Sequence, residues 1–255
     1  MVIFMILAAA VASGGGCPTG MLAVSVAGGV EERGRLASPY CLDRTEVTVA
    51  DYLLCVGTGD CTPPGGQVRV PDIPSKDLSL WSRSCNGPHS ERSQHPVNCV
   101  DSGQAEAYCA AVGKRLPTEA EWQWAATGGE ESRRFPWGES KPSKTLLNAC
   151  DFDCLDRLRA FGQARPTLHY GEDGFAETAP VGSFPDGAGR WGHLDLAGNV
   201  WEFTATPYSA DGSVRVMRGG GWLQSNREMV ESGYRGGFPA SARGSVVGFR
   251  CADDL

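Results

Sequence analysis

The stretch HPVNCVDSGQAEAYCAAVGKRLPTEAEWQWAATGG, residues 95–129, contains two consecutive helix signals. The first helix is expected to begin near Asp101 and to end before Gly113. The residues that share its apolar face are Ala105, Tyr108, Cys109 and Val112. The second helix follows directly, because Thr118 and Glu121 match a capping box and Gly128 supplies a stop signal. Its inward residues are Trp122, Ala125 and Ala126.

Toward the N-terminus, a strand and a further helix are expected. Residues 22–27 alternate in polarity as a strand does, and residues 40–45 lead into the helix. Thr48 is a good N-cap because Asp51 lies three residues after it, and Gly57 is the expected stop. This helix would present one apolar face to the rest of the domain.

Toward the C-terminus, residues 213–217 and 246–251 are strand-like. The segments 58–98 and 129–212 show no periodicity and are expected to be mostly loop. Loops this long in a compact domain are usually held by disulfides or bound ions. The sequence therefore predicts a loop-rich α+β fold with modest regular secondary structure.

The composition bounds the size and the partners of the protein. The chain has 255 residues, 41% of them hydrophobic, which suits one large domain. Its 30 Asp and Glu exceed its 23 Lys and Arg, so nucleic acid and anionic membrane surfaces are not expected as partners. Thirty-four glycines and sixteen prolines without a repeat period argue against a helix bundle or a solenoid.

An apolar run near the N-terminus, residues 2–12, has the length of a signal-peptide core and is too short to cross a bilayer as a helix. Small residues then lead into Cys17, as in a bacterial lipoprotein cleavage site. We therefore expect residues 1–16 to be a signal peptide and Cys17 to carry a lipid anchor in the cell envelope. Gly14 stands where a leucine would strengthen this match, and no basic residue precedes the apolar run. The alternative is an ordinary secretory signal and a disulfide-bonded Cys17.

Ten cysteines in an exported chain indicate a disulfide framework. Three pairs are close in sequence: Cys55 with Cys61, Cys85 with Cys99, and Cys150 with Cys154. None of these spacings is typical of a four-cysteine zinc site, and no two of the four histidines have the spacing of a metalloprotease site. We assign the first two pairs as disulfides, whereas the partners of Cys41, Cys150 and Cys154 stay open. A lipid on Cys17 would leave at least one free or intermolecular thiol.

Seven motifs occur in order along the chain. They are residues 95–129 as quoted, FPWG (135–138), GEDGF (171–175), PVGSFPDG (180–187), LDLAGNVWEF (194–203), RGGGW (218–222) and GFRC (248–251). Together they resemble the formylglycine-generating-enzyme (sulfatase-modifying factor) family. The resemblance implies a single disulfide-stabilised α+β domain of C-type-lectin-like topology over residues 37–255, after a linker with a short strand at residues 17–36. It also implies a disulfide between Cys109 and Cys251.

The same resemblance implies two calcium sites built from hard oxygen ligands. The first set is Asp195, Gly198, Val200 and Glu202. Its two acidic residues would contribute side chains and the other two backbone carbonyls. The second set is Asn148, Ala149, Asp173 and Phe175, in which Asn148 and Asp173 would contribute side chains. The alternative for each set is a hydrogen-bonded turn without a metal.

The catalytic cysteine pair of the family oxidases is replaced in this chain. In those enzymes a motif Arg-Gly-Gly-Ser-aromatic-Leu is followed by one cysteine and, five positions later, by another, and this pair binds copper(I). Here the two positions are Gln224 and Met229, and Gly221 replaces the serine. A thiolate is both the soft copper ligand and the redox group, so catalysis and a copper or iron cofactor are not expected. The family pocket residues are retained, either as a binding site or for stability alone: Trp201, Arg218, Trp222, Arg235 and Arg250.

Three classes of function are compatible with these features. The interpretation that we prefer is an exported, non-catalytic binding or scaffold module, whose ligand would be a protein, a peptide or a glycan. The second is a family oxidoreductase with altered chemistry, like the nonheme-iron sulfoxide synthases, but four scattered histidines make a poor iron site. The third is a formylglycine-generating oxidase that uses other residues.

Overall fold

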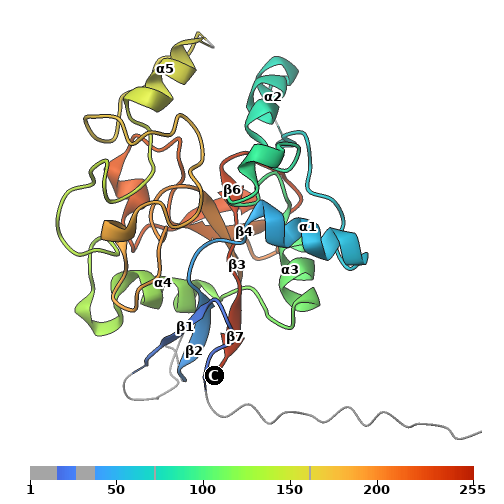
Figure 1. Cartoon of the computed structure of the whole chain (residues 1–255), viewed down its shortest axis with the longest axis vertical. Coiled ribbons are helices and arrows are strands. Elements are labelled where there is room, and N and C mark those ends of the chain that lie inside the picture. Colours follow the sequence, from blue (N-terminus) through green and yellow to red (C-terminus); the bar gives the residue numbers. More distant parts are fainter. Residues whose placement is uncertain (1–15, 27–37, 72, 161) are drawn as a thin grey trace, which may run out of the picture.

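The computed structural model describes residues 16–26, 38–71, 73–160 and 162–255, and it consists of two small sheets joined by helices and long loops (Figure 1). The helices are α1 (Val49–Thr58), α2 (Ser75–Trp81), α3 (Ser102–Ala111), α4 (Glu119–Thr127) and α5 (Phe152–Ala160). Short 3₁₀ turns are η1 (Ser82–Ser84), η2 (Ser90–Arg92), η3 (Gly129–Glu131), η4 (Pro185–Gly187) and η5 (Arg227–Val230). The loop-rich α+β fold predicted from the sequence is confirmed.

The two sheets bring distant parts of the chain together. The first, in the order β1-β2-β7, contains β1 (Met21–Val24), β2 (Tyr40–Asp43) and β7 (Ala252–Asp254). The second, in the order β5-β4-β3-β6, contains β3 (Trp201–Pro207), β4 (Val214–Arg218), β5 (Gly236–Pro239) and β6 (Val247–Gly248). All neighbours are antiparallel except β3 and β6. In Figure 1 the first sheet lies beside the C-terminus, whereas α2 and α5 project at the opposite end.

The helix starts follow the capping signals of the sequence. Thr48 accepts the Asp51 backbone N–H at 3.0 Å and caps α1. The capping box of α4 is complete, because the Thr118 hydroxyl accepts the Glu121 N–H and the Glu121 carboxylate accepts the Thr118 N–H. A third N-cap, Asp101, opens α3. Asp151 caps α5 in the same way, so side chains that satisfy the free N–H groups of the first turn fix four of the five helix starts.

Several sequence expectations are wrong in detail. Gly57 does not stop α1, since the helix continues to Thr58 and is capped by Gly59 with a left-handed φ of 87°. Val112 lies beyond the end of α3 and is 44% exposed. Helices α2 and α5 lie in segments expected to be loop. The strand expected over residues 246–251 is reduced to the two residues of β6.

The main core lies between α1, α3 and the second sheet. Tyr52 of α1 stacks on Tyr108 of α3 with ring centroids 5.4 Å apart, and Phe249 meets Tyr108 edge-on at 5.5 Å. A second cluster packs Trp122 of α4 against Leu42 of the first sheet. Helix α3 belongs to the first cluster and α4 to the second. Both sheets therefore pack against helices that come from the stretch 95–129.

All ten cysteines are paired. The disulfides are Cys17–Cys41, Cys55–Cys61, Cys85–Cys99, Cys109–Cys251 and Cys150–Cys154. The three predicted pairs are confirmed. In this structure Cys17 is bonded to Cys41, as in the alternative of an ordinary secretory signal, and no cysteine is free. The predicted signal peptide lies outside the described residues except for Gly16.

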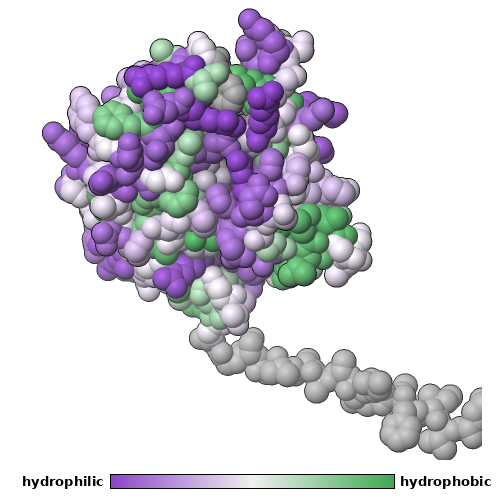
Figure 2. Space-filling view, turned by 45° about the horizontal axis from the view of Figure 1, so that its top comes forward, coloured by the Kyte–Doolittle hydropathy of each residue, from purple (hydrophilic) through white to green (hydrophobic). Residues whose placement is uncertain are grey.

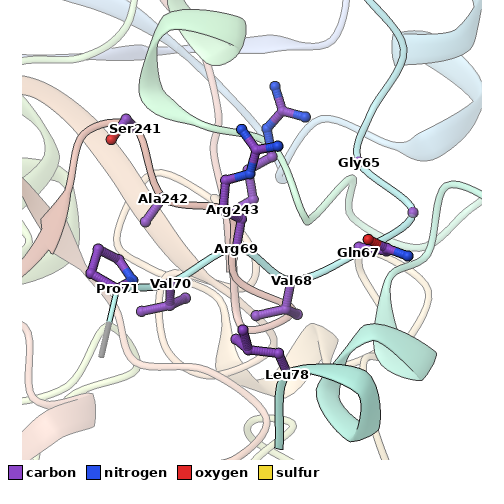
Figure 3. Close-up of a pocket in the computed structure, with 11 residues that line it drawn as sticks. Gly65, Gln67, Val68, Arg69, Val70, Pro71, Leu78, Ser241, Ala242 and Arg243 are labelled. Carbon is purple, nitrogen blue, oxygen red and sulfur yellow. The ribbon is translucent and has the colours of Figure 1, made fainter. Parts of the chain in front are cut away.

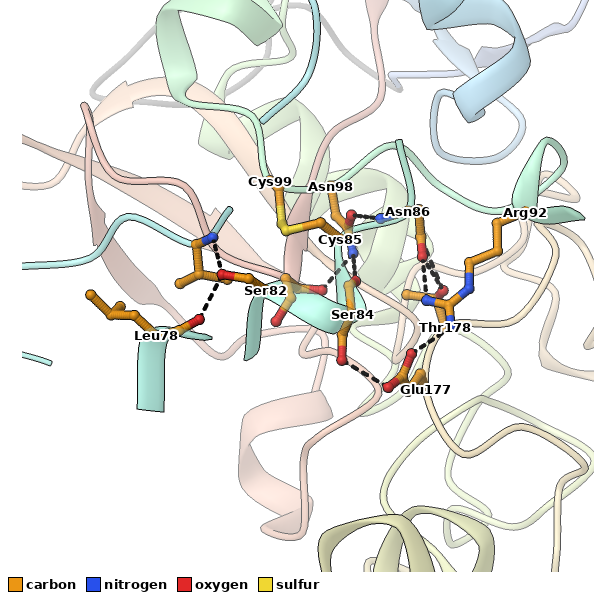
Figure 4. The surroundings of a disulfide bond; sticks show 12 residues. Leu78, Ser82, Ser84, Cys85, Asn86, Arg92, Asn98, Cys99, Glu177 and Thr178 are labelled. Atoms are coloured by element: carbon orange, nitrogen blue, oxygen red, sulfur yellow. Dashed lines mark hydrogen bonds and ion pairs between the residues drawn. A yellow bond between two sulfur atoms is a disulfide. The ribbon is translucent and has the colours of Figure 1, made fainter. Parts of the chain in front are cut away.

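The polar network around Cys85–Cys99 holds the long segment 82–99 in place (Figure 4). The Asn98 amide donates to the carbonyls of Ser84 and Ser245 and accepts the Asn86 backbone N–H at 2.7 Å. The buried side-chain amides of Asn86 and Asn98 thus have hydrogen-bond partners, which burial requires. None of the helices in the described ranges is long and apolar enough to span a bilayer.

Candidate functional site

The oxidase loop, defined here as residues 218–230, carries Gln224 and Met229, the two positions to which the resemblance assigns the oxidase cysteines. The Gln224 N–H donates to the Gly221 carbonyl at 2.9 Å, and the Gln224 carbonyl accepts the Cys150 N–H at 3.0 Å. Met229 is partly buried against the main core. Since every cysteine is in a disulfide, no thiolate is available at this loop, and the residues present do not fit a copper(I) site.

Gly221, at the position of the family serine, allows a close contact. A Cβ atom there would lie 3.1 Å from the Val246 carbonyl oxygen and 3.3 Å from Cδ1 of Trp201. Any side chain at this position would push Trp201 or the 246 backbone away. The loop is therefore packed tightly where the oxidases carry a hydroxyl.

Two helices that the sequence did not predict cover the oxidase loop. Trp81, the last residue of α2, approaches Trp222 with ring centroids 6.3 Å apart. Leu158 of α5 and the Cys150–Cys154 disulfide pack on the same indole. The Trp222 indole N–H donates to a buried backbone carbonyl, that of Ser245, at 3.2 Å. Trp222 is thereby enclosed and does not face solvent.

The retained pocket residues do not surround an opening. Four of them are exposed by 1% or less: Trp201, Arg218, Trp222 and Arg250. Arg218 donates to the Tyr234 carbonyl at 2.5 Å and lies 3.2 Å from the Glu119 carboxylate, which Arg235 reaches from the surface at 2.8 Å. Arg250 belongs to a separate buried cluster. These side chains bind carboxylates and backbone carbonyls inside the fold, which agrees with the alternative that they are retained for stability.

A buried charge cluster lies where the resemblance places the first calcium set. Glu202 and Arg250 are both inaccessible to solvent, and the guanidinium binds the two carboxylate oxygens at 2.7 Å each. The Trp122 indole N–H donates to the same carboxylate at 2.8 Å. Arg250 also donates to the Leu194 carbonyl at 2.9 Å, which ties the cluster to the turn before Asp195.

Asp195 and Glu46 complete this cluster. Asp195 has a φ of 57° and accepts the Gly182 N–H at 2.6 Å. Glu46 is 2% exposed, and neither of its carboxylate oxygens has a hydrogen-bond partner among the described residues. Burial raises the pKa of Glu46 well above its ordinary value, and the Asp195 carboxylate raises it further. Burial also raises the pKa of Asp195.

The charge of this cluster is of the kind that a divalent cation would balance. Three buried carboxylates face a single guanidinium, which leaves two negative charges uncompensated if all are ionised. Calcium prefers carboxylate and carbonyl oxygens, and the orphaned oxygens of Glu46 are such ligands. Gly198, with a φ of 83°, and Val200 lie on the turn between Asp195 and Glu202. The resemblance did not identify Glu46. In the sequence it is only an acidic residue next to an apolar segment, which does not mark it as a ligand.

The second predicted calcium set is also brought together. Asp173 accepts the Phe175 N–H at 2.9 Å and the Ala149 N–H at 3.4 Å. The Asn148 side-chain oxygen is buried without a partner. Burial, with Asp151 nearby, raises the pKa of Asp173 to about 7. Two further potential metal ligands lie close to Asp173: Asp151 and His169. The sequence did not single them out as ligands.

A groove of about 650 Å³ lies beside the helix α2 (Figure 3). Its lining consists of residues 65–71, Leu78 and residues 241–243. The two loops are joined by a pair of backbone hydrogen bonds between Arg69 and Arg243, each 2.8 Å. In Figure 3 the two guanidinium groups point away from the apolar side of the groove, where Leu78 lies. Arg243 binds Asp101, whereas Arg69 is exposed. The groove thus combines an apolar lining with a cationic rim.

The fold and these sites define a disulfide-rich, loop-rich α+β domain of the formylglycine-generating type, in which all ten cysteines are in disulfides. Residues 16–255 match the family described as "Sulfatase-modifying factor enzyme 1-like domain". The chain therefore belongs to that family.

Individual relatives agree with this assignment. The chain is 39% identical over 186 residues to "Inactive C-alpha-formylglycine-generating enzyme 2" of Bos taurus, covering 69% of this chain and 56% of the relative. It is 39% identical over 260 residues to the formylglycine-generating enzyme of Streptomyces coelicolor, covering 85% and 78%. The solved structure of PvdO from Pseudomonas aeruginosa shares the fold, with a TM-score of 0.59 and 24% identity over 92% of this chain and 90% of PvdO. The chain spans little more than half the length of its mammalian inactive relative.

Proposed function

We propose that the protein is an exported, non-catalytic binding or scaffold domain of the sulfatase-modifying factor family. The proposal rests on the chemistry of the side chains in the oxidase loop. The two positions of the oxidase cysteine pair hold Gln224 and Met229, and all ten cysteines are in disulfides. An amide and a thioether do not replace a thiolate pair that must bind copper(I) and be oxidised. The similarity to a mammalian relative named as inactive also supports a non-catalytic role.

Export is supported by the cysteines. Five disulfides in one domain form and persist in oxidising compartments, and cytosolic thiols are kept reduced. The apolar run at residues 2–12 supplies the matching signal core. The proposed location is the cell envelope or the extracellular space.

Calcium is the proposed structural ion of the Glu46, Asp195 and Glu202 cluster. When bound, it would supply the positive charge that Arg250 alone does not supply. Its role would be to hold the turn of residues 195–202 against Glu46, from a segment about 150 residues earlier in the chain.

The proposed ligand is a protein, a peptide or a glycan, and the groove of residues 65–71 and 241–243 is the proposed contact surface. Its apolar lining gives contact area, and the exposed Arg69 supplies a cation for an acidic group of the ligand. The groove is separated from the buried Trp222 by Trp81, so ligand contact there does not need the oxidase loop.

The decisive experiment asks for aldehyde formation. Purified protein is incubated with copper(I), oxygen, a reductant and a peptide that contains Cys-x-Pro-x-Arg, and mass spectrometry is used to look for formylglycine. We expect none. A clear yield from the wild-type protein would overturn the proposal.

A matched pair of variants tests whether the oxidase loop lacks only the two thiols or has also changed its conformation. The double variant Gln224→Cys with Met229→Cys restores two thiols, and Gln224→Ser with Met229→Ser is its control. Copper binding by the first and not by the second would show that only the thiols are missing from the oxidase loop. The tight packing at Gly221 predicts that copper binding returns without efficient turnover.

A further inference from the structure

Three metal-ligating side chains converge beneath the oxidase loop, on the segments before and after α5. One ligand atom from each of Asp151, His169 and Asp173 lies within 4.8 Å of the other two. Asp151 is fully buried, His169 is 6% exposed, and Asp173 is partly buried. Two carboxylates and an imidazole at this separation can reach a single ion.

His169 is the group that points to a ligand. Both of its ring nitrogens are buried, and neither has a hydrogen-bond partner among the described residues. An imidazole N–H or lone pair left unpaired inside a protein is costly, so buried histidines are normally bonded. A metal ion at the ring would satisfy one nitrogen directly.

The carboxylate of Asp151 is held in place before any ion binds. One of its oxygens accepts the N–H groups of Asp153 and Cys154 at 2.9 and 3.3 Å. The other accepts the Asp173 N–H at 2.5 Å. The backbone of residue 168 is fixed as well, because the Leu168 N–H donates to the Cys150 carbonyl at 2.7 Å. Backbone hydrogen bonds and the Cys150–Cys154 disulfide therefore preorganise the two segments.

We propose that Asp151, His169 and Asp173 form a binding site for a borderline divalent cation such as zinc. Imidazole nitrogen with carboxylate oxygen suits Zn²⁺ and similar first-row ions, whereas calcium takes oxygen ligands in larger number. Three protein ligands leave at least one position of a four-coordinate ion for water.

Asp173 also belongs to the second calcium set implied by the family resemblance. Calcium and the borderline cation would therefore compete for this carboxylate. The calcium set uses no nitrogen ligand. The dependence of binding on His169 therefore distinguishes the two ions.

The site would couple to the oxidase loop through one residue. Cys150, next to Asp151, donates its N–H to the Gln224 carbonyl, and the Cys150–Cys154 disulfide packs on Trp222. An ion bound at Asp151 would thus hold α5 and its disulfide against the loop.

The test is metal titration of the metal-free, disulfide-intact protein. Isothermal titration calorimetry with zinc alone is expected to show one site, and cobalt(II) alone to give visible d–d absorption typical of nitrogen and oxygen ligands. The variant His169→Ala is expected to bind zinc at least about 10-fold more weakly. Because no thiol is free, cysteine cannot account for the zinc bound. The control is His89→Ala, which removes a more exposed histidine and should leave zinc binding unchanged.

Several results would overturn the proposal: no zinc binding by the wild type, equal zinc binding by His169→Ala, or displacement of zinc by equimolar calcium. If His169→Ala does not fold by circular dichroism, Asp173→Asn is used, since its side chain is partly exposed and keeps its size. The cobalt spectrum of the wild type gives an answer without any variant. None of these readouts depends on aldehyde formation, so the site is tested separately from the proposed function.

Discussion

Removal of the Cys109–Cys251 disulfide should destabilise the domain more than removal of any short-loop disulfide. The bond joins residues 142 positions apart, whereas Cys55–Cys61 joins residues six apart. The chain-entropy relation gives about 5 kcal/mol for the long loop and about 2 kcal/mol for the short one at 25 °C. All four cysteines are at least nine-tenths buried, so replacement by alanine removes a similar volume in each case.

The assay compares two double variants, Cys109→Ala with Cys251→Ala and Cys55→Ala with Cys61→Ala. Urea unfolding is followed by tryptophan fluorescence without reductant, and the free energy of unfolding is extrapolated to water. We expect the first variant to lose about 3 kcal/mol more than the second. Equal losses with unchanged m-values would refute the argument that loop length sets the contribution of these bonds.

Three further outcomes are expected. Chelation should lower the melting temperature of the wild type, and Glu46→Gln should remove this sensitivity whereas the exposed Glu130→Gln should not; an unchanged wild-type melting curve would contradict the calcium site. Burial lowers the pKa of His193 to about 3, so the folded state binds fewer protons and stability should fall as pH drops below about 6.5, by about 2 kcal/mol at pH 5. Urea titrations at pH 8 and pH 5 should show that loss reduced in His193→Gln, and an identical loss would exclude this histidine as its source. Trp81→Ala should uncover Trp222 and shift tryptophan emission to longer wavelength, and an unshifted spectrum would show that α2 does not shield it.

Helices with local signals were predictable, and those without them were not. Thr118 and Glu121 encode the start of α4 within four residues, so the sequence alone locates it. In contrast, α2 has no side-chain cap and no fully buried residue, and α5, although Asp151 caps its first turn, buries only Cys154 and Leu158. Both helices are fixed by contacts with Trp222 or by a disulfide, which a local pattern does not contain.

The residues of the candidate sites also divide into those that the sequence could identify and those that only the fold brings together. Asp195 and Glu202 lie in one motif and could be identified together from the resemblance. Glu46 joins them only in the folded chain, and Asp151 meets His169 and Asp173 where the Leu168 N–H is bonded back to the Cys150 carbonyl. The two interpretations of the retained pocket residues could not be separated in the sequence for a related reason. A list of retained residues does not reveal that Arg250 binds Glu202 instead of facing solvent.

The structure also explains how this fold tolerates glutamine and methionine at the oxidase positions. The contacts that fix Gln224 in the loop are made by its backbone, to Gly221 and to Cys150, so they do not depend on its side chain. The side chains that do secure the loop are those of Trp222 and Arg218, which are buried and bonded. The disulfides and the buried charge cluster that stabilise the domain lie outside this loop, apart from the Cys150–Cys154 disulfide that packs on it. Stability and the thiol chemistry of the family oxidases therefore depend on different residues, so the domain can keep its shape whether or not this loop carries thiols.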